Sequence, residues 1–303
     1  MRTFVFTCLL LLGMTTFAQD ANFHIYLCLG QSNMEGNAKV EEQDTVAVDS
    51  RFQVLAAVDC PNLGRTKGNW YKAVPPLARC YTGLTPGDYF GRAMVANLPS
   101  NVRVGIINVA VGGCRIELFD KDNYQSYVET SPDWLKNMVK EYGGNPYARL
   151  VEMAKLAQKD GVIKGILLHQ GESNTNDKDW PLKVKGVYDN LLNDLGLSAA
   201  NVPLLAGEVV HADQNGVCAS MNTIIDSLPQ VIPTAHVISS AGCPAAFDNL
   251  HFTAEGYRML GARYAAKMLS ILGYGDWTSA QNMKLWYNRP AQDWLEALPL
   301  GNS

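Results

Sequence analysis

A serine stands directly after an apolar stretch near the start of the chain. The segment IYLCLGQSNMEG covers residues 25–36, and Ser32 lies between Gly30 and Gly36. A serine at the end of a buried strand can cap the following helix, or it can be a nucleophile presented to a substrate. A hydroxyl is a weak nucleophile until a base removes its proton, so the second interpretation requires a histidine within hydrogen-bond reach.

The segment DNLHFTAEGY at 248–257 contains such a histidine. The imidazole of His251 has an ordinary pKa of about 6.5, which suits proton uptake and release near neutrality. Asp248 lies three residues earlier, a spacing that lets its carboxylate accept the Nδ1–H of the ring and leaves Nε2 for Ser32. A D-x-x-H pattern alone is also typical of a solvated turn. Together with the serine motif, it predicts catalysis by Ser32, His251 and Asp248.

Acyl transfer also needs hydrogen-bond donors for the negative oxygen that develops on the attacked carbonyl. The Ser32 backbone amide is one candidate, because unpaired amides at the start of a helix point outward. The Gly113 amide is the second. In NVAVGGCRI (108–116) it follows Gly112 in a turn that permits close approach of another molecule. A plain strand-to-helix turn is the alternative interpretation of this glycine pair.

Short apolar, β-branched runs alternate with amphipathic stretches along the chain, which predicts βαβ units and a mostly parallel sheet with helices on both faces. The expected strands are 23–30, 52–58, 102–113, 162–171, 202–210 and 235–240, and the expected helices are 88–98, 146–158, 184–196, 220–230 and 254–269. Ligands in such folds bind beyond the carboxyl ends of the strands. We expect an active site at that edge, because polar or glycine-rich residues follow four strands, at 30–33, 112–113, 169–172 and 208–211.

Four segments together resemble the SGNH hydrolases: GQSNMEG (30–36), LLHQGESN (167–174), the glycine pair and the D-x-x-H segment. Within that superfamily, the chain is similar to the carbohydrate O-acetylesterases of carbohydrate esterase family six and to sialate O-acetylesterases, over about residues 22–272. The resemblance implies an α/β protein with a three-layer α/β/α fold and a flavodoxin-like, mostly parallel sheet. It also implies a serine esterase that needs no cofactor and no metal.

The resemblance assigns roles within the HQGE segment as well. A side-chain amide is the third oxyanion donor in this group, and Gln170 occupies that place here. Glu172 is expected to matter for activity, either by orienting His251 in place of Asp248 or by holding the loop of Gln170. We favour Asp248 because its pattern is local, and keep Glu172 as a supporting or alternative acid. His169 and Glu172 have the spacing of a metal pair, but no third ligand is suitably placed.

Asn33 and Arg115 follow the nucleophile and the glycine pair, and both are candidates to line the substrate pocket. Arg115 either contacts a carboxylate or hydroxyl of the substrate, or it pairs with Glu35 or Glu117 at the surface; the sequence leaves both open. The partner that the resemblance implies is an acetylated polysaccharide or oligosaccharide.

The composition fits a soluble domain and predicts export. The 303 residues are 47% hydrophobic with a formal charge of −4, and this mild acidity argues against a nucleic-acid or anionic-membrane surface. MRTFVFTCLLLLGMTTFAQ (1–19) has a basic residue, an apolar run and a small residue before Gln19. These features predict a signal peptide over residues 1–18 and a secreted or periplasmic protein. The apolar run is too short to span a bilayer.

The sequence contains seven cysteines, one of them inside the predicted signal peptide. An exported protein can keep disulfides. We expect the pairs Cys60–Cys80 and Cys218–Cys243, because each brackets a loop-rich stretch, and a buried free thiol at Cys28.

We divide the rest of the chain into an SGNH esterase domain at 19–274 and a C-terminal extension at 275–303. Within the extension, NRPAQDWLEALPLGN (288–302) is similar to the start of the glycoside hydrolase family ninety-five enzymes. It is either the truncated start of a glycosidase module or a remnant that packs on the esterase. This similarity favours decorated plant polysaccharide as the substrate.

These observations predict a secreted serine esterase that removes O-acetyl groups from carbohydrate, with acetylated plant polysaccharide such as xylan as the favoured substrate. A sialate O-acetylesterase is the alternative within the same class. A non-catalytic carbohydrate-binding protein on the same fold is the alternative from another class, and the presence of Ser32, Asp248 and His251 speaks against it.

Overall fold

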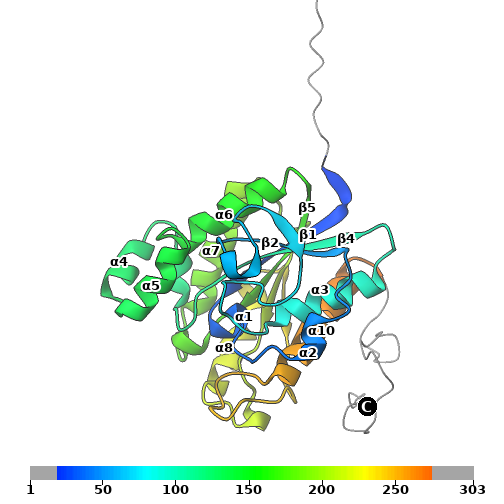
Figure 1. Cartoon of the computed structure of the whole chain (residues 1–303). Coiled ribbons are helices and arrows are strands. Elements are labelled where there is room, and N and C mark those ends of the chain that lie inside the picture. The colour runs from blue at the N-terminus through cyan, green and yellow to red at the C-terminus, as the bar shows by residue number, and fades with distance from the viewer. Residues whose placement is uncertain (1–18, 275–303) are drawn as a thin grey trace, which may run out of the picture.

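The structure, a computed structural model, describes residues 19–274 and contains a seven-stranded sheet between two layers of helices (Figure 1). The strand order is β3-β2-β4-β1-β5-β6-β7. All neighbouring strands are parallel except β3, which runs antiparallel to β2. The strands are β1 (Asp20–Gly30), β2 (Phe52–Leu55), β3 (Trp70–Lys72), β4 (Arg103–Ala110), β5 (Gly161–His169), β6 (Leu204–Gly207) and β7 (Ala235–Ile238).

Both faces of the central strand β1 are buried, and its alternate side chains enter two different cores. One face packs with α6 (Pro146–Ala157) and α7 (Trp180–Leu195), and the other packs with α3 (Pro86–Asn97) and α10 (Ala254–Ile271). The side chains that point to α6 and α7 are Phe23, Ile25, Leu27 and Leu29, and those on the α3 and α10 side are Tyr26 and Cys28. The near-continuous apolar run in the sequence therefore reflects a strand covered on both sides.

Shorter helices occupy the connections, and several lie near the carboxyl ends of the strands. They are α1 (Ser32–Glu35), α2 (Glu42–Thr45), α4 (Tyr124–Thr130), α5 (Asp133–Glu141), α8 (Asn222–Ile225) and α9 (Leu228–Val231). The 3₁₀ turns are η1 (Pro61–Leu63), η2 (Ile116–Phe119), η3 (Glu172–Asn174), η4 (Ala212–Gln214) and η5 (Ala219–Met221). Figure 1 shows α4 and α5 together at one side of the sheet.

The central strands end at the same level, which brings distant parts of the sequence to one edge. Gly30 pairs in register with Ala110 on one side and with His169 on the other. A Cβ on Gly30 would lie 2.0 Å from the His169 carbonyl oxygen, and the residue has a positive φ of 151°. Only glycine fits this close approach, so Gly30 fixes the turn from β1 into α1 directly beside the end of β5.

The predicted three-layer α/β/α architecture with a mostly parallel sheet is confirmed. The parallel strands, counted in chain order, lie in the order 2-3-1-4-5-6, whereas flavodoxin has the order 2-1-3-4-5. The sequence patterns missed β3, α4 and α5, and the expected helix at 220–230 is broken into η5, α8 and α9.

The cysteine predictions had mixed outcomes. The Cys60–Cys80 disulfide is confirmed, and Cys28 is a buried free thiol as expected. The Cys218–Cys243 pair is wrong, because both residues are free cysteines. Cys218 instead lies against the Glu172 carbonyl, while Cys243 is buried in the core beneath α10.

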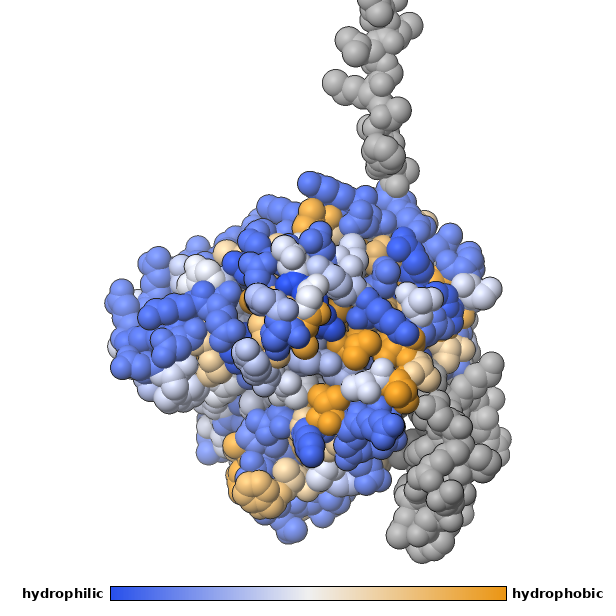
Figure 2. Space-filling view, in the orientation of Figure 1, coloured by the Kyte–Doolittle hydropathy of each residue, from blue (hydrophilic) through white to orange (hydrophobic). Residues whose placement is uncertain are grey.

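The signal-peptide prediction (1–18) and the C-terminal extension (275–303) lie outside the described residues. Within residues 19–274, no helix is long and apolar enough to cross a membrane, and no group of three or more His, Cys, Asp or Glu residues is arranged to hold a metal ion. The face seen in Figure 2 is mostly hydrophilic, with hydrophobic residues in small groups.

Candidate active site

Ser32 is the first residue of α1, immediately beyond the carboxyl end of β1. Its Oγ lies 2.9 Å from Nε2 of His251. The serine is 8% exposed, so the hydroxyl is held in a largely buried turn but can be reached from the surface. The structure therefore brings together the two residues that the sequence placed more than two hundred positions apart.

Asp248 lies on the other side of the imidazole, with its Oδ2 2.7 Å from Nδ1 of His251. Its second oxygen accepts hydrogen bonds from the backbone amides of Leu250 and His251, each at 3.0 Å. Burial opposes ionisation of this carboxyl group, but the hydrogen bonds from His251 and from the two amides outweigh it and hold the pKa of Asp248 below its usual range. An ionised Asp248 fixes the ring with Nε2 facing Ser32.

The loop of Asp248 and His251 leads directly into α10, and the start of that helix is locally specified. Thr253 is the N-cap, and its Oγ1 accepts the Gly256 amide at 3.1 Å. The cap satisfies an amide that would otherwise be unpaired at the helix start. The capped, largely buried helix α10 therefore fixes the position of the loop that carries His251.

Among the described hydrogen bonds of residues 19–274, neither the Ser32 amide nor the Gly113 amide has an acceptor. Gly113 follows β4 and has a φ of +70°. The positive φ favours glycine, and a Cβ at this position would lie 2.6 Å from the Trp134 ring and displace it. The oxyanion-binding role of these two amides therefore stays a prediction that the geometry allows.

Gln170 does not have the geometry expected of the third oxyanion donor. Its Nε2 faces three protein oxygens: Asn174 Oδ1 at 2.7 Å, Gln31 Oε1 at 3.1 Å and the Cys114 carbonyl at 3.3 Å. Its Oε1 accepts the indole N–H of Trp180, and the side chain is 1% exposed. The amide is occupied inside the protein, and we assign Gln170 a positioning role.

Asn33 also differs from its prediction, because it is fully buried rather than part of the substrate pocket. Its Nδ2 donates to Glu172 Oε1 and, at 3.1 Å, to the Leu250 carbonyl. Its Oδ1 accepts the Tyr257 hydroxyl at 2.6 Å. Asn33 thus ties the nucleophile turn to the loop after β5 and to the loop that carries His251.

Asn33 links Glu172 to the loop of His251 through the Leu250 carbonyl. No hydrogen bond joins the Glu172 carboxylate to the imidazole among the described contacts, and its Oε2 has no partner within residues 19–274. Burial raises the pKa of Glu172. Of the two acids considered from the sequence, Asp248 is therefore the one in contact with the His251 ring. No described contact joins Glu172 to that ring.

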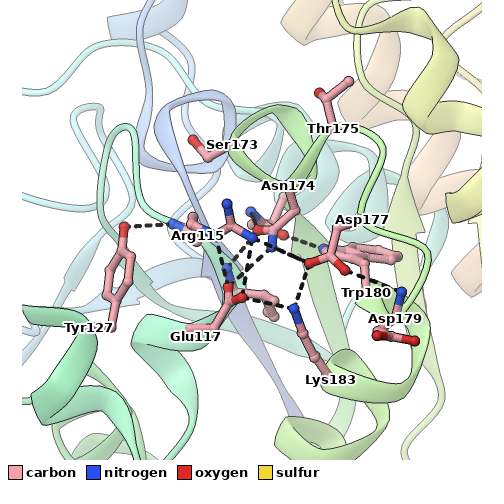
Figure 3. A network of polar contacts seen from close by, with 12 residues as sticks. Arg115, Glu117, Tyr127, Ser173, Asn174, Thr175, Asp177, Asp179, Trp180 and Lys183 are labelled. Atoms are coloured by element: carbon pink, nitrogen blue, oxygen red, sulfur yellow. Dashed lines mark hydrogen bonds and ion pairs between the residues drawn. The ribbon is translucent and has the colours of Figure 1, made fainter. Parts of the chain in front are cut away.

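Arg115 belongs to an ion-pair network rather than to a free pocket wall (Figure 3). Its guanidinium lies 3.4 Å from Glu117 and 3.4 Å from Asp177. Lys183 pairs with the same two carboxylates, at 2.9 and 2.6 Å. Of the alternatives left open for Arg115, pairing with Glu117 is the one observed. Asn174 donates to both carboxylates as well, which joins this network to Gln170.

His169 is buried, and neither nitrogen of its ring has a hydrogen-bond partner among the described residues. Its Nε2 is 3.7 Å from Glu172 Oε1, and burial lowers its pKa to about 3. The ring is neutral at ordinary pH. With no third candidate ligand within residues 19–274, the pair is structural.

Gln31 and Arg79 are site residues that the sequence reasoning missed. The Oε1 of Gln31 accepts from Gln170 Nε2 and from the Ser173 amide, at 3.1 and 3.2 Å. Arg79 pairs with Glu35 of α1 at 2.6 Å. A buried polar residue directly before the nucleophile was a usable signal for Gln31, whereas nothing in the local sequence marked Arg79.

A hydroxyl, an imidazole and a carboxylate joined in series at the carboxyl edge of a parallel sheet form the constellation of a serine hydrolase. The chain belongs to the family described as "Carbohydrate esterase, sialic acid-specific acetylesterase", whose profile matches residues 22–270. It is therefore an esterase of a carbohydrate-esterase family, as the motifs predicted.

Individual relatives agree with this membership. The chain is 25% identical to the probable carbohydrate esterase At4g34215 of Arabidopsis thaliana over 264 residues, which are 81% of this chain and 90% of that protein. The X-ray structure of the Arabidopsis protein matches with a TM-score of 0.63 at 22% identity, over 83% of this chain and 99% of that one.

Two further solved structures share the fold. NanS matches with a TM-score of 0.60 at 15% identity, over 84% of this chain and 99% of that chain. XAC1771, described as a novel carbohydrate acetylesterase from Xanthomonas citri, matches with a TM-score of 0.57 at 18% identity, over 82% of this chain and 56% of that chain.

Proposed function

We propose that this esterase removes O-acetyl groups from carbohydrate, with acetylated plant polysaccharide such as xylan as the substrate. The observation that carries the proposal is the hydrogen-bonded series Ser32, His251 and Asp248 in a chain of a carbohydrate-esterase family. The side chains of Asn33 and Gln170 are bonded inside the protein, which supports assigning the chemistry to these three side chains together with the Ser32 and Gly113 amides.

The reaction follows from these groups. Ser32 Oγ attacks the acetyl carbonyl while His251 Nε2 takes the hydroxyl proton. The amides of Ser32 and Gly113 bind the negative oxygen of the tetrahedral intermediate. When the C–O bond to the sugar breaks, the imidazolium returns its proton to the leaving sugar oxygen. Water then attacks the acetyl-enzyme by the same proton path and releases acetate and free Ser32.

Acetate release from a panel of acetylated xylan, pectin, xyloglucan and sialoglycan tests the proposal. We expect release from at least one plant polysaccharide. Release from the sialoglycan alone would support the second candidate, a sialate O-acetylesterase, which the description of the family favours. Binding to acetylated sugars without acetate release would instead support a non-catalytic carbohydrate-binding protein.

We also propose that the protein is exported, to the periplasm or beyond. The composition of residues 1–18 supports this, and the Cys60–Cys80 disulfide is compatible with an oxidising compartment. Mass spectrometry of protein recovered from the exported fraction should give an N-terminus near Gln19. An intact N-terminus on cytoplasmic protein would contradict export. That residues 275–303 lead into a glycosidase module remains a proposal that rests on sequence similarity alone.

A further inference from the structure

Trp134 lies exposed beside the turn that carries the Gly113 amide. It is one of the large hydrophobic residues that are exposed to solvent, with an exposed fraction of 54%. The Cη2 atom of its ring is 2.6 Å from the position that a Cβ of Gly113 would take. The ring therefore rests on Gly113 itself, with no side chain between the indole and the turn that holds the amide.

The helix that carries Trp134 is firmly attached to the catalytic edge. Leu135 and Val139 of α5 are buried in the core on the α6 and α7 side of the sheet. At the other end of the helix, Arg79 bridges Glu141 to Glu35 of the nucleophile helix. The indole is thus held at a fixed place relative to Ser32, as a binding surface requires.

Immediately after α5, the hydroxyl of Tyr142 donates to the Ala110 carbonyl at the end of β4, at 3.2 Å. The ion pair at Glu35 is itself mostly buried, and burial raises the pKa of that carboxyl group although Arg79 opposes the shift. These contacts connect α5 to the two segments that supply Ser32 and Gly113.

Exposed polar residues lie close to Trp134 along α5. Asp133 and Asn137, on the same helix, are both exposed. A flat aromatic surface within a polar rim matches a pyranose ring, which has C–H groups on its faces and hydroxyl groups around its edge. Aromatic residues with polar neighbours are favoured at binding sites for this reason. A long acyl chain would need a continuous apolar groove instead.

We propose that Trp134 is a stacking platform for a sugar ring of the acetylated substrate, and that it gives the enzyme its preference for sugar esters over simple acetates. The proposal rests on the proposed function and names the subsite of that function. A sugar stacked on the indole has its substituents beside the Gly113 amide, where an acetyl carbonyl can be attacked by Ser32.

The test compares an acetylated xylo-oligosaccharide with ethyl acetate, which has no ring to stack. For Trp134→Ala, we expect the ratio of kcat/KM on the oligosaccharide to kcat/KM on ethyl acetate to fall about tenfold, mainly through a higher KM for the oligosaccharide. Trp134→Phe should recover most of the ratio. As a matched control, Ile271→Ala removes an exposed apolar side chain at the far end of α10 and should leave the ratio unchanged.

A ratio within twofold of wild type in Trp134→Ala would overturn the platform. Failure of the proposed function gives a different result, because the wild-type protein itself would then release no acetate from the acetylated xylo-oligosaccharide. A fall in activity on both esters together would also count against the platform, since it would indicate damage to the Gly113 turn.

Discussion

The loop that carries Asp248 and His251 meets Ser32 at the surface, whereas the loop of Gln170 and Asn174 on the other side of the turn is buried. The side chains of His251 and Asp248 are 15% and 33% exposed, while Gln170 and Asn174 are each 1% exposed. The first loop offers a ring nitrogen, His251 Nε2, that can exchange a proton with the Ser32 hydroxyl. In the second loop, the amide groups are bonded to protein partners.

This difference separates the residues that react from the residues that hold them. A group that performs acid–base or electrostatic catalysis needs an unoccupied donor or acceptor facing the substrate. A buried amide with every position bonded stabilises the geometry around it but has nothing left to offer. Both segments contain polar residues that could take part in catalysis. The loop of Asp248 and His251 has a group that faces Ser32, whereas the amides of Gln170 and Asn174 are bonded to other parts of the protein.

Removing the base is the change with the largest expected effect. For His251→Ala we expect kcat to fall at least ~10³-fold, because no other group accepts the Ser32 proton. His211→Ala, at a partly exposed histidine after β6, is the control and should retain activity. A loss of less than tenfold in His251→Ala would contradict the division between the two loops.

The orienting acid gives the next largest effect. Asp248→Asn should lower kcat roughly 10³-fold, since an amide cannot stabilise the imidazolium or fix the tautomer. Glu172→Gln, an equally conservative change one step further from the ring, should lower kcat only about tenfold. Steady-state kinetics of both variants checks this order. A larger loss of kcat in Glu172→Gln than in Asp248→Asn would make Glu172 the acid that orients His251.

His169, the buried histidine beside Glu172, should make the stability of the protein depend on pH. His169 has a folded pKa of about 3 against an ordinary value of about 6.5 in the unfolded chain. Between these values the unfolded chain binds the proton and the folded protein does not, so stability is lost as the pH falls from about 6.5 toward 3, by up to about 1.4 kcal/mol per pH unit.

Urea unfolding of His169→Leu measures this contribution, with His211→Leu as the control. Between about pH 6 and pH 4, the slope of the unfolding free energy against pH should be smaller in His169→Leu than in the wild type. The difference should correspond to about one proton bound on unfolding. An unchanged slope would mean that His169 is protonated in the folded protein.

Gln170→Met sharpens the comparison from the side of the buried loop. The near-isosteric change leaves the buried Trp180 indole N–H without its acceptor, which should cost about 1–3 kcal/mol of unfolding free energy. We expect kcat to change less than tenfold. A loss of kcat of about 10²-fold with unaltered stability would instead restore Gln170 as an oxyanion donor.

Arg115→Ala should have the smallest effect. Its ion pairs are long and 44% of the side chain is exposed, so we expect a change in stability of about 0.5 kcal/mol or less. The KM for acetylated saccharide should stay within twofold of wild type. A KM raised fivefold or more would show that Arg115 contacts substrate after all.

The sequence predicted the strands around the site well, because β1, β4 and β5 are apolar runs that end in polar or glycine signals. It missed β3, a three-residue edge strand, since Trp70–Lys72 has no alternation long enough to detect. It also missed α5, whose buried face consists of Leu135 and Val139 alone. The platform at Trp134 therefore could not be foreseen.

The sequence predicted which residues lie at the site better than it predicted what each side chain does there. Asp248 and His251 are three residues apart, so their contact is a local property that spacing can predict. The direction of the Asn33 and Gln170 amides depends on partners such as Leu250, which is more than two hundred residues from Asn33 along the chain. Such long-range contacts leave no signal in one sequence. The Cys218–Cys243 pair failed for the same reason, because bracketing a loop does not fix distance in space.

The central claim is that Ser32 is the nucleophile, and active-site labelling tests it most directly. Wild-type protein treated with diethyl 4-nitrophenyl phosphate should gain one phosphoryl adduct, located on Ser32 by peptide mass spectrometry, and lose acetate release in proportion. Ser32→Ala should gain no adduct and release no acetate. An adduct on another residue, or full acetate release by Ser32→Ala, would contradict the account.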